Sequence, residues 1–136
     1  MTVNNVTMFD IVWYDNLTKP FLNPPAWVFP PVWIILYCTL LIALLFYTVS
    51  ISEKKKIKGY LIFIVHMIFN ILWSPVFFAL HRIGMALAIV ILMDITAIYM
   101  IKKFYAVSKI SGLILLPYLC WILFATYLNL QFLVLN

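Results

Sequence analysis

The chain has 136 residues, of which 67% are hydrophobic and only 10% are charged. A soluble domain carries about 45–50% apolar and about 25% charged residues, so this composition excludes a water-soluble globular fold and predicts an integral membrane protein. The net charge of +5 does not indicate a nucleic-acid partner, because the basic residues are concentrated in short loops between long apolar segments.

The N-terminal segment, residues 1–25, contains no apolar run long enough to span a membrane or to form a signal peptide. We expect it to lie at the membrane surface, ahead of the first spanning helix.

Four long apolar stretches follow and predict an all-α integral membrane protein, with one transmembrane helical bundle over residues 26–136. A helix rises about 1.5 Å per residue, so roughly 20 residues cross a hydrocarbon layer of about 30 Å. The expected spans are 26–50, 59–80, 83–105 and 110–134. Their outer faces make membrane lipid a necessary partner.

The distribution of basic residues predicts the orientation of the bundle. Seven of the nine lie at or between the facing ends of the first and second spans or of the third and fourth, namely Lys54, Lys55, Lys56, Lys58, Lys102, Lys103 and Lys109. Only Lys19 and Arg82 fall on the opposite side. The positive-inside rule therefore predicts cytoplasmic lysine-rich loops, with both termini on the other side.

The stretch NPPAWVFPPVW places prolines at the start of the first span. Proline is tolerated in the first turn of a helix, so Pro24 and Pro25 are expected to begin this helix, with Asn23 as its N-cap. Pro30 and Pro31 then predict a kink or a loosely wound first turn that faces the bundle interior.

Aromatic and polar residues recur on one face of three spans. Trp33 and Tyr37 are one turn apart in the first, and Asn70, Trp73 and Phe77 follow i, i+3, i+7 spacing in the second. Such residues can be packing contacts between helices, but together the tryptophans favour a cavity for a flat aromatic ligand. The fourth span contributes Tyr118, Trp121 and Ala125 to the same set of candidates. Asn129 follows on the same face, where a hydrogen bond between helices is a more ordinary role than ligand contact.

Asp94 lies near the middle of the third span. A carboxyl group there costs roughly 2.5–3.5 kcal/mol on insertion scales, so we expect Asp94 to face the bundle interior or a wet cavity. It is a further candidate for ligand contact, although a hydrogen bond between helices is the more ordinary role.

No pattern indicates a bound cofactor, a metal site or acid–base catalysis. His66 is one histidine without a second ligand at metal spacing. Cys38 and Cys120 fall inside separate spans, and we expect them to be packing residues rather than a disulfide.

Several runs of residues resemble one known family. They are WYDNLTKP (13–20), PPAWVFPPVWIILY (24–37), NILWSPVFF (70–78) and PYLCWILFATYLN (117–129). Over residues 13–136 the chain is similar to the tryptophan-rich sensory protein or translocator protein (TspO/MBR) family. Members are five-helix membrane proteins, often dimeric, that bind porphyrins, certain synthetic aromatic ligands and, in mitochondrial forms, cholesterol.

The resemblance implies that Trp33 and Trp121 face the ligand cavity, that Tyr14 belongs to a loop covering it, and that Asn70 and Trp73 line it. It implies a membrane protein that binds porphyrin or related tetrapyrroles as a sensor, scavenger or transporter. One alternative is an enzyme of oxidative, light-dependent porphyrin degradation with Trp33 and Trp121 as redox-active residues. Another is a structural membrane partner that has lost ligand binding.

The sequence departs from the family pattern at Phe21, where Trp is usual, and at Pro30, where Gly is usual. Only twelve residues precede Trp13, where the family has a whole helix. We therefore expect either a start further upstream or a four-helix variant whose open seam is closed by a second copy, giving a homodimer. No basic residue follows Lys109, so a sterol motif is not expected in the last helix. A prokaryotic inner membrane is the expected location.

Overall fold

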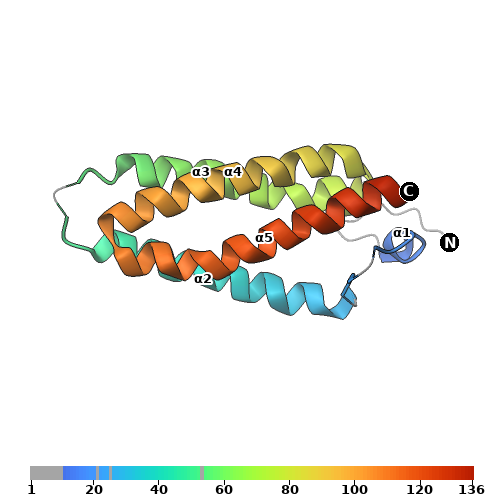
Figure 1. The fold of residues 1–136 in the computed structure, drawn as a ribbon, viewed down its shortest axis with the longest axis horizontal. Helices are drawn as coiled ribbons and strands as arrows, with labels where there is room; N and C mark the ends of the chain where they lie inside the picture. Colours follow the sequence, from blue (N-terminus) through green and yellow to red (C-terminus); the bar gives the residue numbers. More distant parts are fainter. Residues whose placement is uncertain (1–10, 21, 25, 53) are drawn as a thin grey trace.

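The computed structural model describes residues 11–20, 22–24, 26–52 and 54–136, and these form an elongated helical bundle (Figure 1). The chain is an all-α integral membrane protein, and these described residues include four helices long and apolar enough to span a membrane. In chain order the elements are α1 (Ile11–Asp15), the 3₁₀ turn η1 (Ala26–Val28), α2 (Phe29–Val49), α3 (Ile57–Ser74), the π-helical turn η2 (Pro75–Ala79), α4 (Ile83–Val107) and α5 (Lys109–Leu135).

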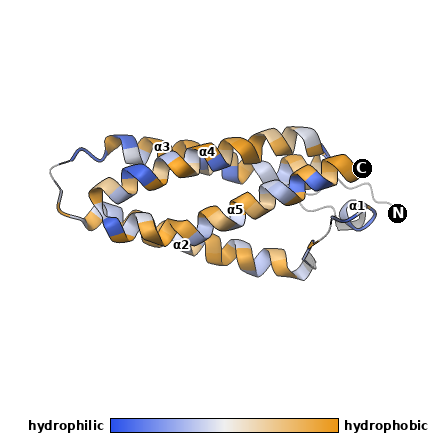
Figure 2. Cartoon of the chain, in the orientation of Figure 1, coloured by the Kyte–Doolittle hydropathy of each residue, from blue (hydrophilic) through white to orange (hydrophobic). Residues whose placement is uncertain are grey.

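The long helices are hydrophobic along most of their length, whereas the loop between α2 and α3 is hydrophilic (Figure 2). Large apolar side chains such as Ile34 and Leu45 are exposed on the outer face of α2, where they can contact lipid. Trp27 is 74% exposed, consistent with an interfacial tryptophan. Cys38 and Cys120 are free and exposed on the outer surface, so they face lipid and are not the packing residues that we expected.

The four long helices do not pack equally against one another. α5 lies along α4 and α2, and α3 lies along α4. Within the described ranges no Cα of α2 is within 8 Å of a Cα of α3, so these two helices meet only through side chains. Toward its N-terminal end α2 diverges from the rest of the bundle (Figure 1).

The start of α2 differs in detail from the sequence expectation. The α-helix begins at Phe29, with Pro30 and Pro31 in its first turn, and η1 precedes it. The turn before the α-helix is a 3₁₀ turn, which is wound more tightly than an α-helix, and Pro30 and Pro31 are exposed, so the expectation of a loosely wound turn facing the bundle interior was wrong. Val28 rather than Asn23 is the N-cap, Pro24 does not begin the helix, and Pro25 lies outside the described residues. The Asn23 Oδ1 that would act as a cap instead accepts from the Tyr14 hydroxyl at 3.3 Å, and Asn23 Nδ2 donates to the same hydroxyl at 3.0 Å.

The end of α3 widens into the π-helical turn. The backbone N–H of Leu80 donates to the carbonyl oxygen of Pro75 at 2.9 Å, five residues back. A π turn rotates the following side chains relative to an α-helix, and here both Phe77 and Phe78 are buried.

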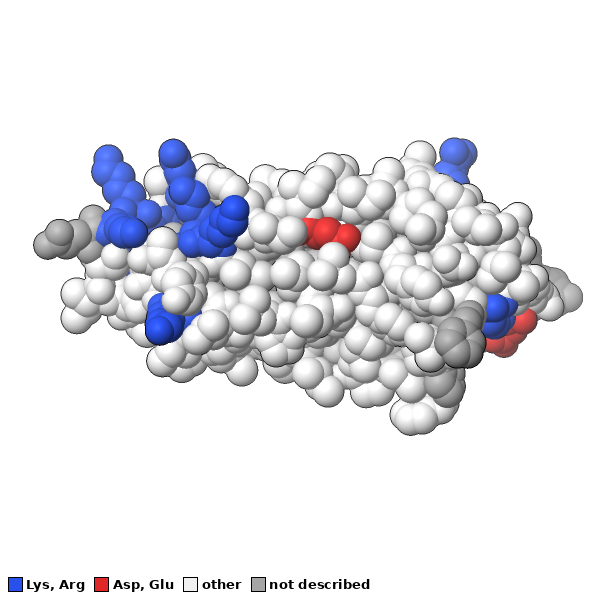
Figure 3. All heavy atoms as spheres, viewed as in Figure 1, with Lys and Arg blue, Asp and Glu red and all other residues white. Residues whose placement is uncertain are grey.

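The end of the bundle that carries the lysine-rich loops is tightly packed. The Tyr47 ring stacks on Phe104 with centroids 4.2 Å apart, and its hydroxyl donates to the carbonyl oxygen of Lys56 at 2.8 Å. Ser111 Oγ on α5 donates to the carbonyl oxygen of Ala43 on α2 at 2.5 Å. Basic side chains gather around this end (Figure 3).

Candidate ligand-binding site

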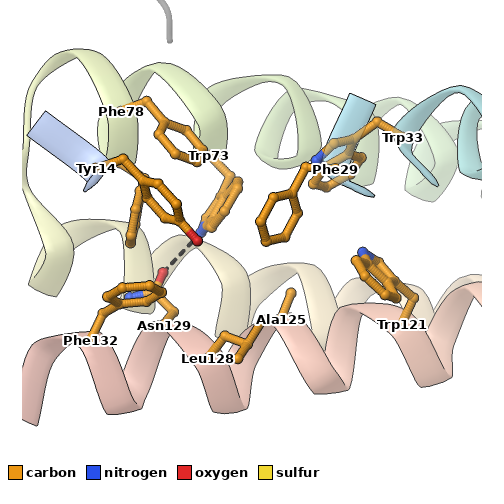
Figure 4. A pocket seen from close by; sticks show the side chains of 11 residues that line it. Tyr14, Phe29, Trp33, Trp73, Phe78, Trp121, Ala125, Leu128, Asn129 and Phe132 are labelled. Carbon is orange, nitrogen blue, oxygen red and sulfur yellow. Dashed lines mark hydrogen bonds between the residues drawn. The ribbon is translucent and has the colours of Figure 1, made fainter. Parts of the chain in front are cut away.

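A pocket of about 370 Å³ lies near the opposite end, where α2 diverges from the other helices. Its walls come from α2, from the α3–η2 region and from α5, and α1 closes it (Figure 4). The lining residues are Tyr14, Phe29, Trp33, Trp73, Phe77, Phe78, Trp121, Ala125, Leu128, Asn129 and Phe132. This volume includes the open mouth of the pocket.

Three tryptophans from three helices line the pocket and make its wall aromatic. Trp33 of α2 lies 6.0 Å from Trp73 of α3, measured between ring centroids. Phe29 projects between α2 and α5 and lies 6.5 Å from Trp121. Because indole and phenyl rings present flat π-faces, this wall suits a planar aromatic ligand.

The side-chain amide of Asn129 holds the Trp73 ring in place on the inner wall of the pocket. Asn129 Oδ1 accepts a hydrogen bond from Trp73 Nε1 at 2.9 Å, and Asn129 Nδ2 donates to the carbonyl oxygen of Ile83 at 3.0 Å (Figure 4). Within the part of the chain that the structure describes, the indole N–H groups of Trp33 and Trp121 have no such partner. These two donors are therefore available to an acceptor on a ligand.

The segment around α1 covers the pocket through Tyr14, which is only 3% exposed. Besides the bond from Asn23, Lys19 Nζ donates to the carbonyl oxygens of Tyr14 and Leu17 and lies 4.8 Å from the Tyr14 ring centroid. Burial raises the pKa of the Tyr14 hydroxyl above its ordinary value, and the bond from Asn23 opposes this shift.

The last residue of the chain holds this covering segment from the other side. Asn136 Oδ1 accepts from the backbone N–H of Thr18 at 2.9 Å, and Asn136 Nδ2 donates to the carbonyl oxygen of Thr18 at 3.1 Å. The end of α5 is thereby joined to the loop by two hydrogen bonds, both exposed to solvent.

Further from this end, a chain of buried hydrogen bonds crosses the bundle. Tyr37 donates to Asn70 Oδ1 at 3.2 Å, Asn70 Nδ2 donates to Tyr118 Oη at 2.7 Å, and Tyr118 Oη lies 2.5 Å from His66 Nε2. His66 Nδ1 lies 2.8 Å from Thr96 Oγ1, whose hydroxyl donates to backbone carbonyls of its own helix. The chain therefore links α2, α3, α5 and α4.

The structure thus separates the sequence-predicted residues into two groups. Tyr14, Trp33, Trp73, Phe77, Trp121 and Ala125 are brought together around the pocket. Tyr37, Asn70 and Tyr118 lie outside its lining in the hydrogen-bond chain, and Asp94 lies outside it beside Thr126.

Sequence reasoning did not select Phe29, Phe78, Leu128 or Phe132 as pocket residues, and it assigned Asn129 to a hydrogen bond between helices ahead of ligand contact. A signal for Phe132 was present, because it continues the stripe of Trp121, Ala125 and Asn129 at helical spacing. No sequence signal indicated Phe78, since the π turn brings it to the same side as Phe77.

The fold and the pocket define a multi-pass helical membrane protein with an aromatic ligand pocket beneath a loop at one end of the bundle. The TspO/MBR family matches residues 1–135, and the chain belongs to this family.

Relatives come from bacteria and from animals. The chain is 38% identical over 125 residues to the tryptophan-rich protein TspO of Chlorobaculum tepidum, covering 91% of this chain and 79% of the relative. It is 38% identical over 124 residues to the tryptophan-rich sensory protein of Cereibacter sphaeroides (91% and 77%). It is 32% identical over 119 residues to the human translocator protein (86% and 70%).

Proposed function

We propose that this protein binds a flat aromatic ligand of the porphyrin or tetrapyrrole class in the pocket, as a sensor, scavenger or transporter. The observation that carries this proposal is the placement of Trp33, Trp73 and Trp121, from three helices, around one pocket. The names of the relatives, a sensory protein and a translocator, support a role in ligand binding rather than a purely structural one.

The pocket chemistry favours a large planar ligand with few polar groups. Its walls are aromatic, and the free N–H groups of Trp33 and Trp121 can each donate to a ligand acceptor. The enclosed space between these side chains is too small for a tetrapyrrole. We therefore expect binding to move Phe29, which stands between α2 and α5, aside.

Quenching of tryptophan fluorescence by added protoporphyrin in detergent or nanodiscs tests this proposal. Replacing Trp33 or Trp121 by Phe should weaken binding by about 1 kcal/mol, because aromatic pairs add roughly 0.5–1.5 kcal/mol beyond their burial. Trp27→Phe, at an exposed position, is the matched control and should leave the affinity unchanged. Equal losses at all three positions, or no saturable quenching by the wild type, would contradict the assignment.

Illumination of the porphyrin complex under oxygen separates binding from degradation. Recovery of unchanged porphyrin fits a binding protein. Conversion to a bilin-like product that is lost in Trp33→Phe and Trp121→Phe would instead favour the oxidative enzyme.

We also propose a prokaryotic inner membrane as the location, with the lysine-rich loops in the cytoplasm. The concentration of basic residues at one end of the bundle supports this orientation (Figure 3). In a background without Cys38 and Cys120, a cysteine at Lys55 should be shielded from an impermeant thiol reagent added to intact cells. A cysteine at Asn16 should react, and the reverse pattern would overturn the orientation.

A homodimer is proposed as the assembly in the membrane. The support is the separation between α2 and α3, whose backbones do not approach each other and which a second copy could cover from outside. The expected exposure of Asn70 to lipid does not contribute, because Asn70 is 2% exposed and its amide is bonded to Tyr37 and Tyr118. Light scattering with detergent subtracted should give twice the mass of one chain, and a monomer that still binds porphyrin would contradict this proposal.

A further inference from the structure

Asp94 is an acidic side chain in the middle of a membrane-spanning helix. It lies halfway along α4 and is only 8% exposed. Figure 3 shows an acidic side chain midway along the bundle, far from the basic side chains at either end, and Asp94 is the one Asp or Glu inside the four spans. A bare carboxylate at this depth is unfavourable, so its hydrogen bonds decide its protonation state.

The hydrogen bonds around the carboxyl group do not suit an ionised form. Thr126 Oγ1 on α5 lies 2.5 Å from Asp94 Oδ2, and it is the one donor found for this group among the described residues. Asp94 Oδ1 is buried and has no partner at all. A carboxylate would keep a full charge with one hydroxyl donor and no cation, in a setting where buried charges are normally paired.

A proton on Asp94 Oδ2 removes the buried charge and accounts for these hydrogen-bond distances. A protonated Oδ2 donates to Thr126 Oγ1, and the Thr126 hydroxyl then donates to the carbonyl oxygen of Ile122, which is 2.9 Å away. Oδ1 becomes a neutral carbonyl oxygen, which costs far less to leave unpaired than a charged one.

We propose that Asp94 is a proton-binding site, and that its proton links α4 to α5 and sets the affinity of the pocket for its ligand. The geometry supplies the coupling, because Thr126 follows Ala125 and the same stretch of α5 contributes Trp121 and Asn129 to the pocket wall. Loss of the proton places a charge between the two helices and loosens this wall. The link to the ligand rests on the proposed function, whereas the proton site does not.

No other ionisable group in the packed elements holds this carboxyl group. His66 of α3 and Tyr118 of α5 bond to each other, and Tyr37 of α2 bonds to Asn70. The turn η2 has no ionisable side chain, and Lys102 and Lys103 lie two turns further along α4.

Infrared spectroscopy of the ligand-free protein in nanodiscs tests the proton site. The sequence holds only four Asp and Glu side chains, so the wild type minus Asp94→Asn difference spectrum isolates one group. We expect the carbonyl band of a protonated carboxyl group at neutral pH, shifted by D₂O and shifted again in Thr126→Val but not in Thr126→Ser. A carboxylate band at neutral pH would overturn the proposal, and the Thr126 pair keeps the test valid if Asp94→Asn folds poorly.

Binding of etioporphyrin, a porphyrin without carboxyl groups, tests the coupling. Wild-type affinity should fall at least about fivefold, the lower end of usual coupling between sites, over the pH range in which the infrared band disappears. Asp94→Asn keeps a neutral donor to Thr126, so its affinity should stay high and independent of pH in that range. The same pH profile in both proteins would refute the coupling, whereas no etioporphyrin binding in either would defeat the proposed function and leave the infrared result standing.

Discussion

The two ends of this bundle are built from the same four helices but packed by opposite means. At the lysine-rich end small residues let backbones approach, and a Cβ added to Gly112 would lie 2.8 Å from the Tyr105 Cα. At the pocket end large rings hold α2 and α5 apart, and a Cβ on Gly84 would meet nothing closer than 3.9 Å. A membrane bundle can therefore form a ligand pocket without breaking a helix, by changing side-chain size along its length.

The two ends of the bundle also differ in the hydrogen bonds between their helices. At the lysine-rich end a hydroxyl closes the contact between α2 and α5, through the bond from Ser111 to Ala43. At the pocket end Asn129 fixes the Trp73 ring and the start of α4, and no hydrogen bond of its own reaches α2. The closed end sets the distance between helices, and the open end leaves α2 free to respond to a ligand.

The largest effect is expected from adding a methyl group at the closed end. Gly112→Ala forces its Cβ against the backbone of Tyr105, which cannot move without separating α4 from α5. We expect a loss of about 3 kcal/mol, the upper part of the range for overpacking, measured as a lower unfolding midpoint in detergent. Gly84→Ala is the matched control, and it should leave stability unchanged or raise it by about 0.5–1 kcal/mol. Equal losses would mean that the two ends are packed alike.

A smaller effect is expected from removing the amide of the pocket wall. Asn129→Leu leaves the buried Trp73 N–H and the carbonyl oxygen of Ile83 without their partner, at a cost of about 2 kcal/mol. Both the unfolding midpoint and the protoporphyrin affinity should fall. Ser111→Ala, which removes one hydrogen bond at the closed end, should lower stability by about 1 kcal/mol and leave the affinity unaltered. A parallel loss of affinity there would show that the closed end also shapes the pocket.

Much of the fold was predictable from the sequence because a bilayer leaves few solutions. The spans follow from the length of the nearly charge-free stretches, since backbone polar groups in lipid must be satisfied within a helix. The stripes containing Trp73 and Trp121 were visible because a straight helix has a fixed period.

The remaining features depend on contacts between distant residues. The helical period placed Tyr37 on the same stripe as Trp33, but it could not show that α2 diverges from the bundle within that turn. As a result Trp33 lines the pocket, whereas Tyr37 donates a hydrogen bond to Asn70. Asn23 had the right type and place for an N-cap, and only the position of Tyr14 explains why it serves elsewhere.

A third, weaker test concerns the loop over the pocket. Asn136→Ala removes both bonds to Thr18, but these are exposed and water replaces them, so the loss of stability should stay within about 0.5–1 kcal/mol. The loop should open more often, and stopped-flow dissociation of protoporphyrin should be faster. Ser52→Ala removes a comparable exposed bond, to the backbone N–H of Lys54, at the opposite end and should not change the rate. A rate equal to that of the wild type in Asn136→Ala would show that the loop does not control release.

The smallest effect is expected in alkaline solution, where the buried Tyr14 hydroxyl resists ionisation. Its pKa is raised from the ordinary value of 10.0, mainly by burial, so the closed loop holds the phenolic proton more tightly than an open loop does. Closure is therefore fully favoured below about pH 10 and weakens as the pH rises toward the raised pKa. Dissociation of etioporphyrin should accelerate above pH 10 in the wild type and much less in Tyr14→Phe, which has no proton to lose. Tyr60→Phe, at the lysine-rich end, should retain the acceleration, and an identical response in all three proteins would place the alkaline opening elsewhere in the molecule.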